Sequence, residues 1–300
     1  EAREKHRRVN EALHAVLSIV DELITCRDTD SLLRRSVELA RERLGVERCS
    51  LHLVDGSLMR GTYGTSLQGT TTDERAHSYA AGDYWAHIRQ SHPEGSRWQL
   101  RNAPYREWTR GTMDTLDASG TTACTAIYAD AEALGVFYND NAISGRPLDP
   151  DLQEIIVLYC SLLGHMIRRQ RTEEALRASE ARFRQMADLL PDMIYEADLK
   201  QRLTYVNKAA FDTMGYTRED IARPLRIADL VTPDQVELVQ RRFREMDQGA
   251  EAVPTQYYLR RADGSLLPVE IRSMPCFGPG GELVGYRGVV RDITERLRVE

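Results

Sequence analysis

Hydrophobic side chains in the first 60 residues follow two different repeats. Over residues 1–24 they recur every three or four positions, as on one face of an amphipathic helix, and residues 29–44 repeat this pattern. Residues 49–54 alternate between apolar and polar positions, and Asp55-Gly56 then favours a hairpin turn into residues 58–63. The pattern therefore predicts two helices followed by two antiparallel strands.

The next part of the chain is polar and less periodic. Residues 64–120 are interpreted as irregular, with one helix expected around residues 72–90. Strands are expected again at residues 122–129 and 134–138, where apolar residues return. Together with the first hairpin, these strands predict an antiparallel sheet.

The most regular stretch of the chain begins at Leu152. An apolar stripe continues to Ile167, and neither glycine nor proline occurs between His165 and Leu190. Because helix breakers are missing, we expect one helix that leaves the first domain and enters the second. Leu176 and Phe183 lie seven residues apart, a spacing typical of a two-stranded coiled coil. A monomeric, solvated helix is the alternative.

The remaining residues favour strands at both ends and short helices between them. The expected strands cover residues 193–197, 203–206, 255–261, 266–274 and 283–291. Strands in this order predict a five-stranded antiparallel sheet with helices on one side. The chain as a whole is thus expected to be α+β, with two domains that are each an antiparallel sheet with flanking helices, joined by a long helix.

Composition narrows the classes of function. A net charge of −6 argues against nucleic-acid binding. The five cysteines show no Cys-x-x-Cys spacing, so we expect free thiols in a reducing compartment. The longest apolar run, residues 155–167, is shorter than the ~20 residues of a membrane span, and we expect a cytoplasmic protein without a membrane partner. Charged helical sequence at both ends suggests a piece of a longer protein.

A series of short motifs fills the second half of the chain. They are the helical segment 179–184, the strand 190–195, residues 205–217, the hairpin 261–265, and the last strand with Asp292-Ile293-Thr294-Glu295. Over residues 178–300 these motifs resemble the PAS family. The resemblance implies a sensory domain whose exit motif connects its sheet to a downstream coiled coil. Asp292, Ile293 and Thr294, with Leu176 and Phe183 before the domain, would then transmit the signal.

The first half carries a weaker set of motifs. Its helix up to Arg43, the hairpin over residues 49–63 and residues 134–141 resemble the GAF family over residues 21–168. The two resemblances together imply a tandem GAF–PAS sensory module of a bacterial-type signal transduction protein.

Cofactors known in such domains can be compared with the residues. A flavin photosensor would need a cysteine within residues 218–230, and none occurs there. All seven histidines precede residue 178, which excludes a histidine-ligated haem from the second domain and leaves Cys276 as a formal thiolate ligand. His77, His87 and His92 keep a haem or metal pocket open in the first domain. The cofactor is therefore unknown, and we expect none to be bound covalently.

Two sets of side chains are candidates for ligand contact, with core packing as the alternative for each. In the second domain they are Tyr195, Tyr205, Asn207, Phe211, Leu230, Tyr257 and Ile271. In the first domain they are His52, Tyr63, Trp85 and Tyr128.

The expected organisation is a signalling helix (1–20), a GAF-like domain (21–168), a helical connector (169–180), a PAS-like domain (181–295) and the start of an exit helix (296–300). No motif of an enzyme or a metal site occurs, so we expect no catalytic residue in this chain. We expect a homodimer with parallel helices that senses a ligand or partner. It would signal to an output domain outside the chain, a histidine kinase first and a diguanylate cyclase second. The alternatives are a ligand-free dimerisation and docking module and a haem-bearing sensor.

Overall fold

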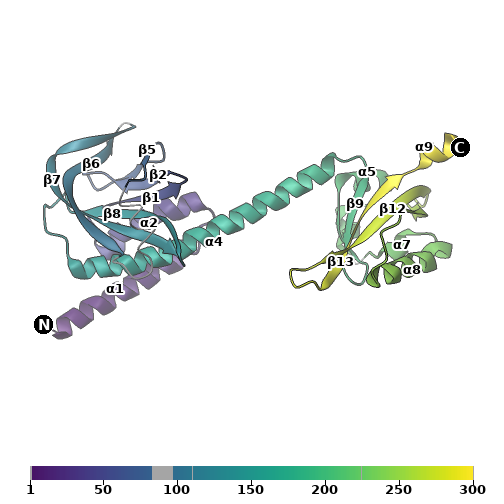
Figure 1. Cartoon of the computed structure of the whole chain (residues 1–300), viewed down its shortest axis with the longest axis horizontal. Coiled ribbons are helices and arrows are strands. Elements are labelled where there is room, and N and C mark those ends of the chain that lie inside the picture. Colours follow the sequence, from purple (N-terminus) through teal and green to yellow (C-terminus); the bar gives the residue numbers. More distant parts are fainter. Residues whose placement is uncertain (1, 83–96, 110, 224, 300) are drawn as a thin grey trace. The chain divides into compact units, whose positions relative to one another are not determined.

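The structure is a computed structural model that describes residues 2–82, 97–109, 111–223 and 225–299 (Figure 1). The chain divides into two compact units, residues 1–176 and 177–300, and each is described by itself. In each unit helices and an antiparallel sheet share a core, so the predicted α+β class is confirmed. Among the described residues, no helix is long and apolar enough to cross a lipid bilayer.

The main sheet of the first unit has six strands. They are β1 (Arg48–Asp55), β2 (Leu58–Gly61), β5 (Ser78–Ala80), β6 (Trp98–Thr109), β7 (Thr112–Ala129) and β8 (Glu132–Asp140). Their order is β5-β2-β1-β8-β7-β6, and every neighbouring pair is antiparallel. Two further strands, β3 (Tyr63–Thr65) and β4 (Thr71–Asp73), form a separate antiparallel pair.

Two sequence predictions for this region are wrong. In the described part of the helix expected around residues 72–90, Thr71–Asp73 and Ser78–Ala80 are strands, and residues 83–90 lie outside the described residues. The stretch interpreted as irregular also contains β6 and the first half of β7, which pair as a long hairpin. Threonines in β7 favour extended structure, but many side chains of β6 are exposed, so no apolar alternation marks that strand.

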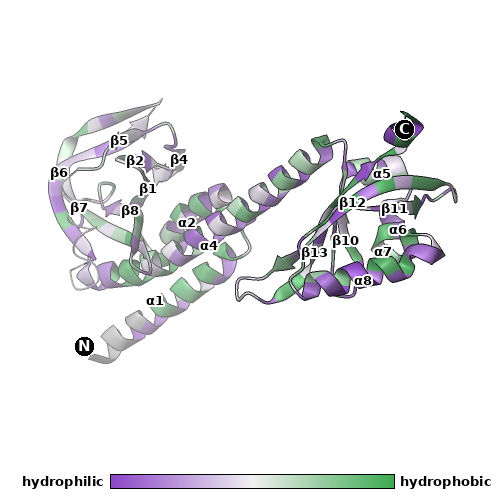
Figure 2. Ribbon diagram, turned by 45° about the vertical axis from the view of Figure 1, so that its right-hand side comes forward, coloured by the Kyte–Doolittle hydropathy of each residue, from purple (hydrophilic) through white to green (hydrophobic). Residues whose placement is uncertain are grey.

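Three helices cover one face of this sheet. They are α1 (Ala2–Leu23), α2 (Thr29–Leu44) and the first part of α4 (Pro150–Leu189), and their hydrophobic side chains meet in one core (Figure 2). The hydroxyl of Tyr159 on α4 donates to the carbonyl oxygen of Ser36 on α2 at 2.8 Å. Gly164 lets α4 approach β7 closely, because a side chain there would overlap the carbonyl oxygen of Tyr128.

Helix α4 is unbroken over its 40 residues. Ile156, Tyr159, Leu163 and Ile167 on its first part are fully buried. Gln170 then donates from Nε2 to the carbonyl oxygen of Arg27 at 2.8 Å. Glu174 accepts a hydrogen bond of 2.6 Å from the backbone of Thr29, at the start of α2. The helix thus belongs to the core of the first unit and continues into the residues of the second.

The sheet of the second unit has five strands, as the sequence predicts. They are β9 (Met193–Ala197), β10 (Leu203–Val206), β11 (Thr255–Arg260), β12 (Leu266–Phe277) and β13 (Leu283–Asp292), in the antiparallel order β10-β9-β13-β12-β11. The short helices α5 (Lys208–Met214), α6 (Arg218–Ala222), α7 (Ile227–Leu230) and α8 (Val236–Asp247) share a core with it. After β13 the chain forms α9 (Thr294–Val299).

Helix starts in this unit follow the sequence signals only in part. Thr217 and Asp220 form the predicted capping box of α6. Thr232 and Gln235 have the spacing of a second capping box, but the side chain of Gln235 instead accepts a hydrogen bond of 2.7 Å from the backbone of Tyr258 on β11. Gln235 therefore connects the start of α8 to β11, the edge strand of the sheet.

Candidate functional site

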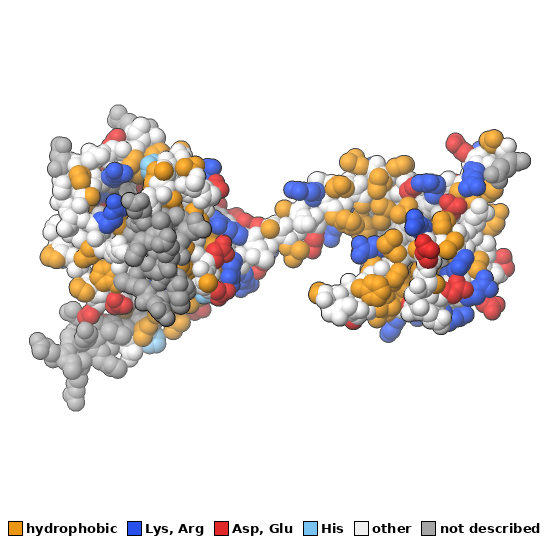
Figure 3. Space-filling model, viewed as in Figure 1, with side chains coloured by type: hydrophobic (Ala, Val, Ile, Leu, Met, Phe, Trp, Pro, Cys, Tyr) orange, Lys and Arg blue, Asp and Glu red, His pale blue; other side chains and the backbone are white. Residues whose placement is uncertain are grey.

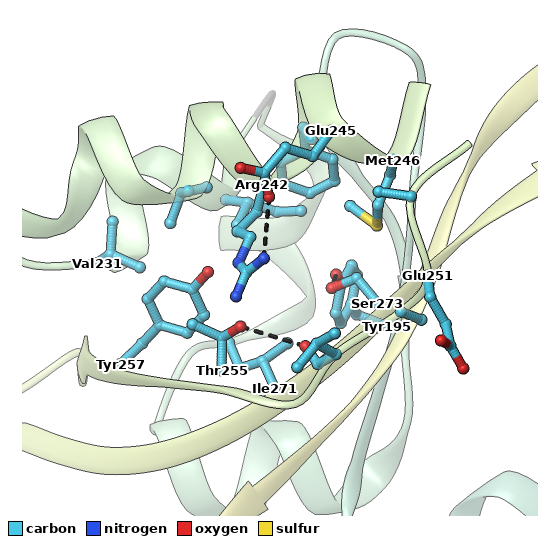
Figure 4. Close-up of a pocket in the computed structure, with 16 residues that line it drawn as sticks. Tyr195, Val231, Arg242, Glu245, Met246, Glu251, Thr255, Tyr257, Ile271 and Ser273 are labelled. Carbon is cyan, nitrogen blue, oxygen red and sulfur yellow. Dashed lines mark hydrogen bonds and ion pairs between the residues drawn. The ribbon is translucent and has the colours of Figure 1, made fainter. Parts of the chain in front are cut away.

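Two small cavities lie between the second unit's sheet and its helices. We call the first the polar cavity; it has a volume of about 40 Å³ and is bordered by Arg242 and Glu245 from α8 and by Tyr257 and Ser273 from the sheet (Figure 4). The second, the apolar cavity, has a volume of about 70 Å³ and is lined by apolar side chains such as Phe211. Both lie far below the ~300 Å³ at which sites for drug-sized ligands begin, so each fits a small group only.

Hydrogen-bonding groups are confined to the polar cavity. The hydroxyls of Tyr195 and Ser273 lie 2.6 Å apart, and burial raises the pKa of Tyr195 to about 12, which keeps the phenol neutral. Arg242 donates from Nη1 to Glu245 at 2.9 Å, while its Nε has no hydrogen-bond partner among the described residues. The cavity therefore combines neutral hydroxyls with one paired cation.

One side chain connects this core to the helix before it. Asn207 is fully buried, caps α5, and accepts hydrogen bonds from the backbone of Ile194 at 2.9 Å and Ala210 at 3.3 Å. Its amide donates to the carbonyl oxygens of Ala187 near the end of α4, at 2.8 Å, and of Asp192, at 3.0 Å. A single amide thus joins α4, β9 and α5.

The start and the end of the second unit also meet at Asp192. Its carboxylate accepts a hydrogen bond of 2.8 Å from Arg291 on β13. Two residues on, Ile293 is buried and its backbone donates to the carbonyl oxygen of Pro268 at 3.1 Å. Asp292 caps Thr294, where α9 begins, through a hydrogen bond of 2.8 Å. Three of the residues predicted to transmit the signal, Asp292, Ile293 and Thr294, therefore lie where β13 passes into α9, and the other two, Leu176 and Phe183, lie on α4.

Most of the second unit is similar to one known family. Residues 191–295 match the family model of the PAS domain. This segment is a PAS domain. In solved structures, the PAS domain of a protein from Colwellia psychrerythraea is 23% identical, with a TM-score of 0.36, over 39% of this chain and 99% of that chain. The PAS domain of an HTR-like protein from Haloarcula marismortui is also 23% identical, with a TM-score of 0.35, over 41% and 98%.

Curated relatives include proteins named as sensors. The C4-dicarboxylate transport sensor protein DctS of Rhodobacter capsulatus is 33% identical over 131 residues, 43% of this chain and 20% of DctS. The methyl sulfide methyltransferase-associated sensor of Methanosarcina acetivorans is 29% identical over 189 residues, 60% of this chain and 18% of that sensor. The uncharacterized protein y4lL of Sinorhizobium fredii is 28% identical over 287 residues, 95% of this chain and 32% of y4lL. The chain spans about a third or less of each relative.

The PAS domain brings five of the seven residues suggested by its sequence to the cavities. Tyr195 and Ile271 border both, Tyr257 borders the polar cavity, and Phe211 and Leu230 border the apolar one. The other two lie elsewhere. The side chain of Asn207 makes all four of these hydrogen bonds with backbone groups and borders neither cavity. Tyr205 borders neither of these cavities but lines, with Phe211, an open pocket of about 350 Å³, and its ring lies 5.9 Å from that of Phe183 on α4.

Sequence reasoning missed two residues of the polar cavity. The charged sequence around Arg241 and Arg242 favours a solvated helix face, but Arg242 borders the cavity and pairs with Glu245. A signal was present, since Arg242 lies next to the buried Phe243 and three residues after the buried Val239. Ser273 lies two residues after Ile271 on β12, hence on the same face of the strand.

The three candidate residues of the first unit that the structure describes, His52, Tyr63 and Tyr128, do not border one cavity. His52 borders a larger cavity of about 260 Å³. The hydroxyl of Tyr63 donates to Asp30 at 2.9 Å, the ring of Tyr128 lies 5.9 Å from the guanidinium carbon of Arg97, and Trp85 lies outside the described residues. His77 follows β4, and His87 and His92 lie outside the described part.

Proposed function

We propose that the chain is the sensory part of a signal transduction protein. A GAF-like first unit and the PAS domain would sense a ligand or a partner, and helices would carry the change to an output domain outside this chain, a histidine kinase in the simplest case. The relatives named as sensors support the general class. The observation that carries the proposal is a set of hydrogen bonds at the two ends of the domain. Asn207 ties the PAS core to the last turn of α4, and Asp192 ties the start of the domain to β13, the strand that leads into α9.

The mechanism follows from those contacts. A group that enters the polar cavity would compete for Tyr195 or Ser273 and shift β9 or β12. Strand β9 carries Ile194, which is bonded to Asn207, and Asn207 is bonded to the last turn of α4. A displacement of β9 would therefore change the geometry at the end of α4. A coupling free energy of ~1–3 kcal/mol is typical of such two-state transmission.

Exposed apolar side chains on α4 support a dimer. Leu176 is 60% exposed, Phe183 49% and Met186 63%. Leu176 and Phe183 are one heptad apart, the repeat at which helices of a parallel coiled coil meet. Hydrophobic side chains also gather on the visible surface of the second unit (Figure 3). We propose that two chains pair along these helices.

An insertion series in the full-length protein tests transmission through α4. Two residues inserted after Arg177 would turn everything downstream by about 200° around the helix, whereas seven would keep the heptad phase. The proposal predicts that the two-residue insertion alters the output activity and that the seven-residue insertion, its matched control, preserves it. Equal output from both insertions and the parent would refute transmission by helix phase.

A ligand-free dimerisation and docking module is the second candidate. The small volumes of the two PAS cavities, about 40 and 70 Å³, favour it, as do the exposed side chains of α4. Native mass spectrometry of the purified chain separates the two. A dimer that carries a bound small molecule supports sensing by ligand. A dimer of bare chains, disrupted by Leu176→Glu with Phe183→Glu, supports the docking module.

A further inference from the structure

A polar cavity in the first unit lies on the face of its sheet away from the helices. Leu51 and Phe137 pack into the helix-side core, and their neighbours His52 and Tyr138 point the opposite way because side chains alternate along a strand. The cavity there has a volume of about 260 Å³ and is bordered by β1, β6, β7 and β8. At ~30 Å³ for each water, it has room for about nine waters, or a molecule of about ten non-hydrogen atoms.

Buried polar groups with unmet hydrogen-bonding capacity border this cavity. The side chain of Arg48 is only 6% exposed; its Nη2 donates to the carbonyl oxygen of Arg106 at 2.6 Å, and its Nε lies 3.7 Å from Asp140. Within the described part of the chain, Nε and Nη1 of Arg48 have no hydrogen-bond partner. Leaving a buried guanidinium partly unpaired is costly, so this side chain indicates a place for an acceptor.

The formal charges around the cavity cancel, with three arginines against three carboxylates, but the carboxylates are already engaged by protein hydrogen bonds. Arg48, Arg101 and Arg106 border it, as do three carboxylates. Each carboxylate already accepts a hydrogen bond from the protein: Glu107 from Leu67 at 2.6 Å, Asp140 from Ala142 at 3.0 Å, and Glu74 from Thr72 at 2.9 Å. Neither Arg101 nor Arg106 has an ion pair with a carboxylate among the residues that the structure describes. Two exposed cations therefore remain for a bound anion.

Aromatic rings form another part of the wall. His77 and Trp108 lie with ring centroids 5.4 Å apart, and the hydroxyls of Tyr79 and Tyr138 lie 3.0 Å apart. Burial lowers the pKa of His77 and favours its neutral form. Flat faces next to arginines suit a ligand that has both a planar ring and an anionic group.

The architecture keeps this wall in place. Tyr79 also lies 3.0 Å from Nδ1 of His52, and Nε2 of His52 lies 3.4 Å from the buried carboxylate of Glu74. Gly64 leaves space for that carboxylate, because any side chain at position 64 would overlap it. The contacts among His52, Tyr79 and Glu74 therefore fix the side chains that border the cavity on this side.

We propose that this cavity binds a small planar organic anion. Its carboxylate or phosphate would lie against Arg48, Arg101 and Arg106, and its ring against Trp108 and His77. The inference concerns the first unit alone and holds whether or not the chain signals through α4.

Calorimetric titration of the purified chain tests the site. The probes are benzoate and phenyl phosphate, with benzamide as the neutral analogue of benzoate. The proposal predicts that at least one anion binds with a stoichiometry of one per chain, and that benzamide binds at least about tenfold more weakly, because hydrogen bonds to charged groups are the strong ones. Tighter binding of benzoate would indicate a carboxylate ligand, and tighter binding of phenyl phosphate would indicate a phosphate ligand.

Variants separate a specific site from general attraction of anions. Arg101→Gln combined with Arg106→Gln changes exposed side chains, so the fold is expected to persist, as an unchanged thermal midpoint would verify. This double variant is expected to lose about tenfold in affinity. Arg60→Gln, which removes an exposed arginine paired with Asp55 outside the cavity, is expected to bind like the parent. Absence of binding by both anions, equal binding of benzamide, or unchanged affinity in the double variant would overturn the proposal.

Discussion

Replacing Asn207 by alanine tests how the PAS domain is joined to α4. The substitution removes the cap of α5, worth about 0.5–2 kcal/mol. It also leaves the buried carbonyl of Ala187 and the backbone N–H of Ile194 without this partner, at about 1–3 kcal/mol for each group that stays dry. Together these terms predict a loss of about 3–5 kcal/mol from the free energy of unfolding of the second unit.

The two units can be followed separately in one urea titration. All three tryptophans precede residue 177, so tryptophan fluorescence reports the first unit, while far-UV circular dichroism reports both. With an m-value of about 2 kcal/mol/M, the second unit's midpoint should fall by about 2 M. Thr217→Ala is the matched control, since it removes an exposed cap that makes no contact with α4 and should cost about 1 kcal/mol.

The result that would refute this reasoning is a similar small shift in both variants. Asn207 would then be an ordinary helix cap, and its bonds to Ala187 and Asp192 would contribute nothing measurable. An equal shift of the tryptophan transition would also contradict it, because the lost hydrogen bonds all lie within the second unit.

Two further predictions concern the first unit and the cysteines. Gly164→Ala should lower the midpoint of the tryptophan transition by the equivalent of about 1–3 kcal/mol. The added methyl group would overlap the carbonyl oxygen of Tyr128, so α4 must move away from β7. An unchanged midpoint would show that the two elements are not in close contact. At pH 8 a thiol reagent such as DTNB should react quickly only with the half-buried Cys26 and Cys276 of the native protein. Burial raises the pKa of Cys49 to about 12, that of Cys124 to about 11 and that of Cys160 well above its ordinary value, so their thiolate fractions at pH 8 are very small and rise only as the pH approaches those values. Fast reaction of three or more thiols before urea is added would contradict this burial.

The fold of the second unit could be predicted because its signals are local and strong. Asp263-Gly264 places Gly264 at a φ of +85° in the turn between β11 and β12, and apolar residues alternate on the strands that flank it. Asn207 was likewise expected to begin a helix, and it does so as the cap of α5. Turns and helix caps of this kind depend only on residues that are close in the sequence, so they can be predicted from the sequence.

The hairpin of β6 and β7 could not be predicted in the same way. Half of the side chains of β6 are exposed, polar residues occupy both faces, and the period of two disappears. Its strand pairing is a property of residues up to 27 positions apart, from Trp98 to Thr125.

The candidate site shows a similar division. Apolar pocket residues such as Ile271 were identifiable from alternation, whereas Arg242 was concealed within a charged helix. Glu74 and Arg48 border the first unit's cavity only because distant strands bring them together. The function of a charged residue depended on its tertiary partners, and the sequence does not show these.

Hydrogen–deuterium exchange after filling the polar cavity tests the central claim most directly. Ser273→Leu places a larger side chain against Tyr195 and imitates an occupied cavity. The account predicts altered exchange in the peptides that cover residues 181–189 of α4 and residues 293–299, with no change over residues 156–167. Changes confined to the strands and helix that border the cavity would contradict transmission from the PAS core to its helices.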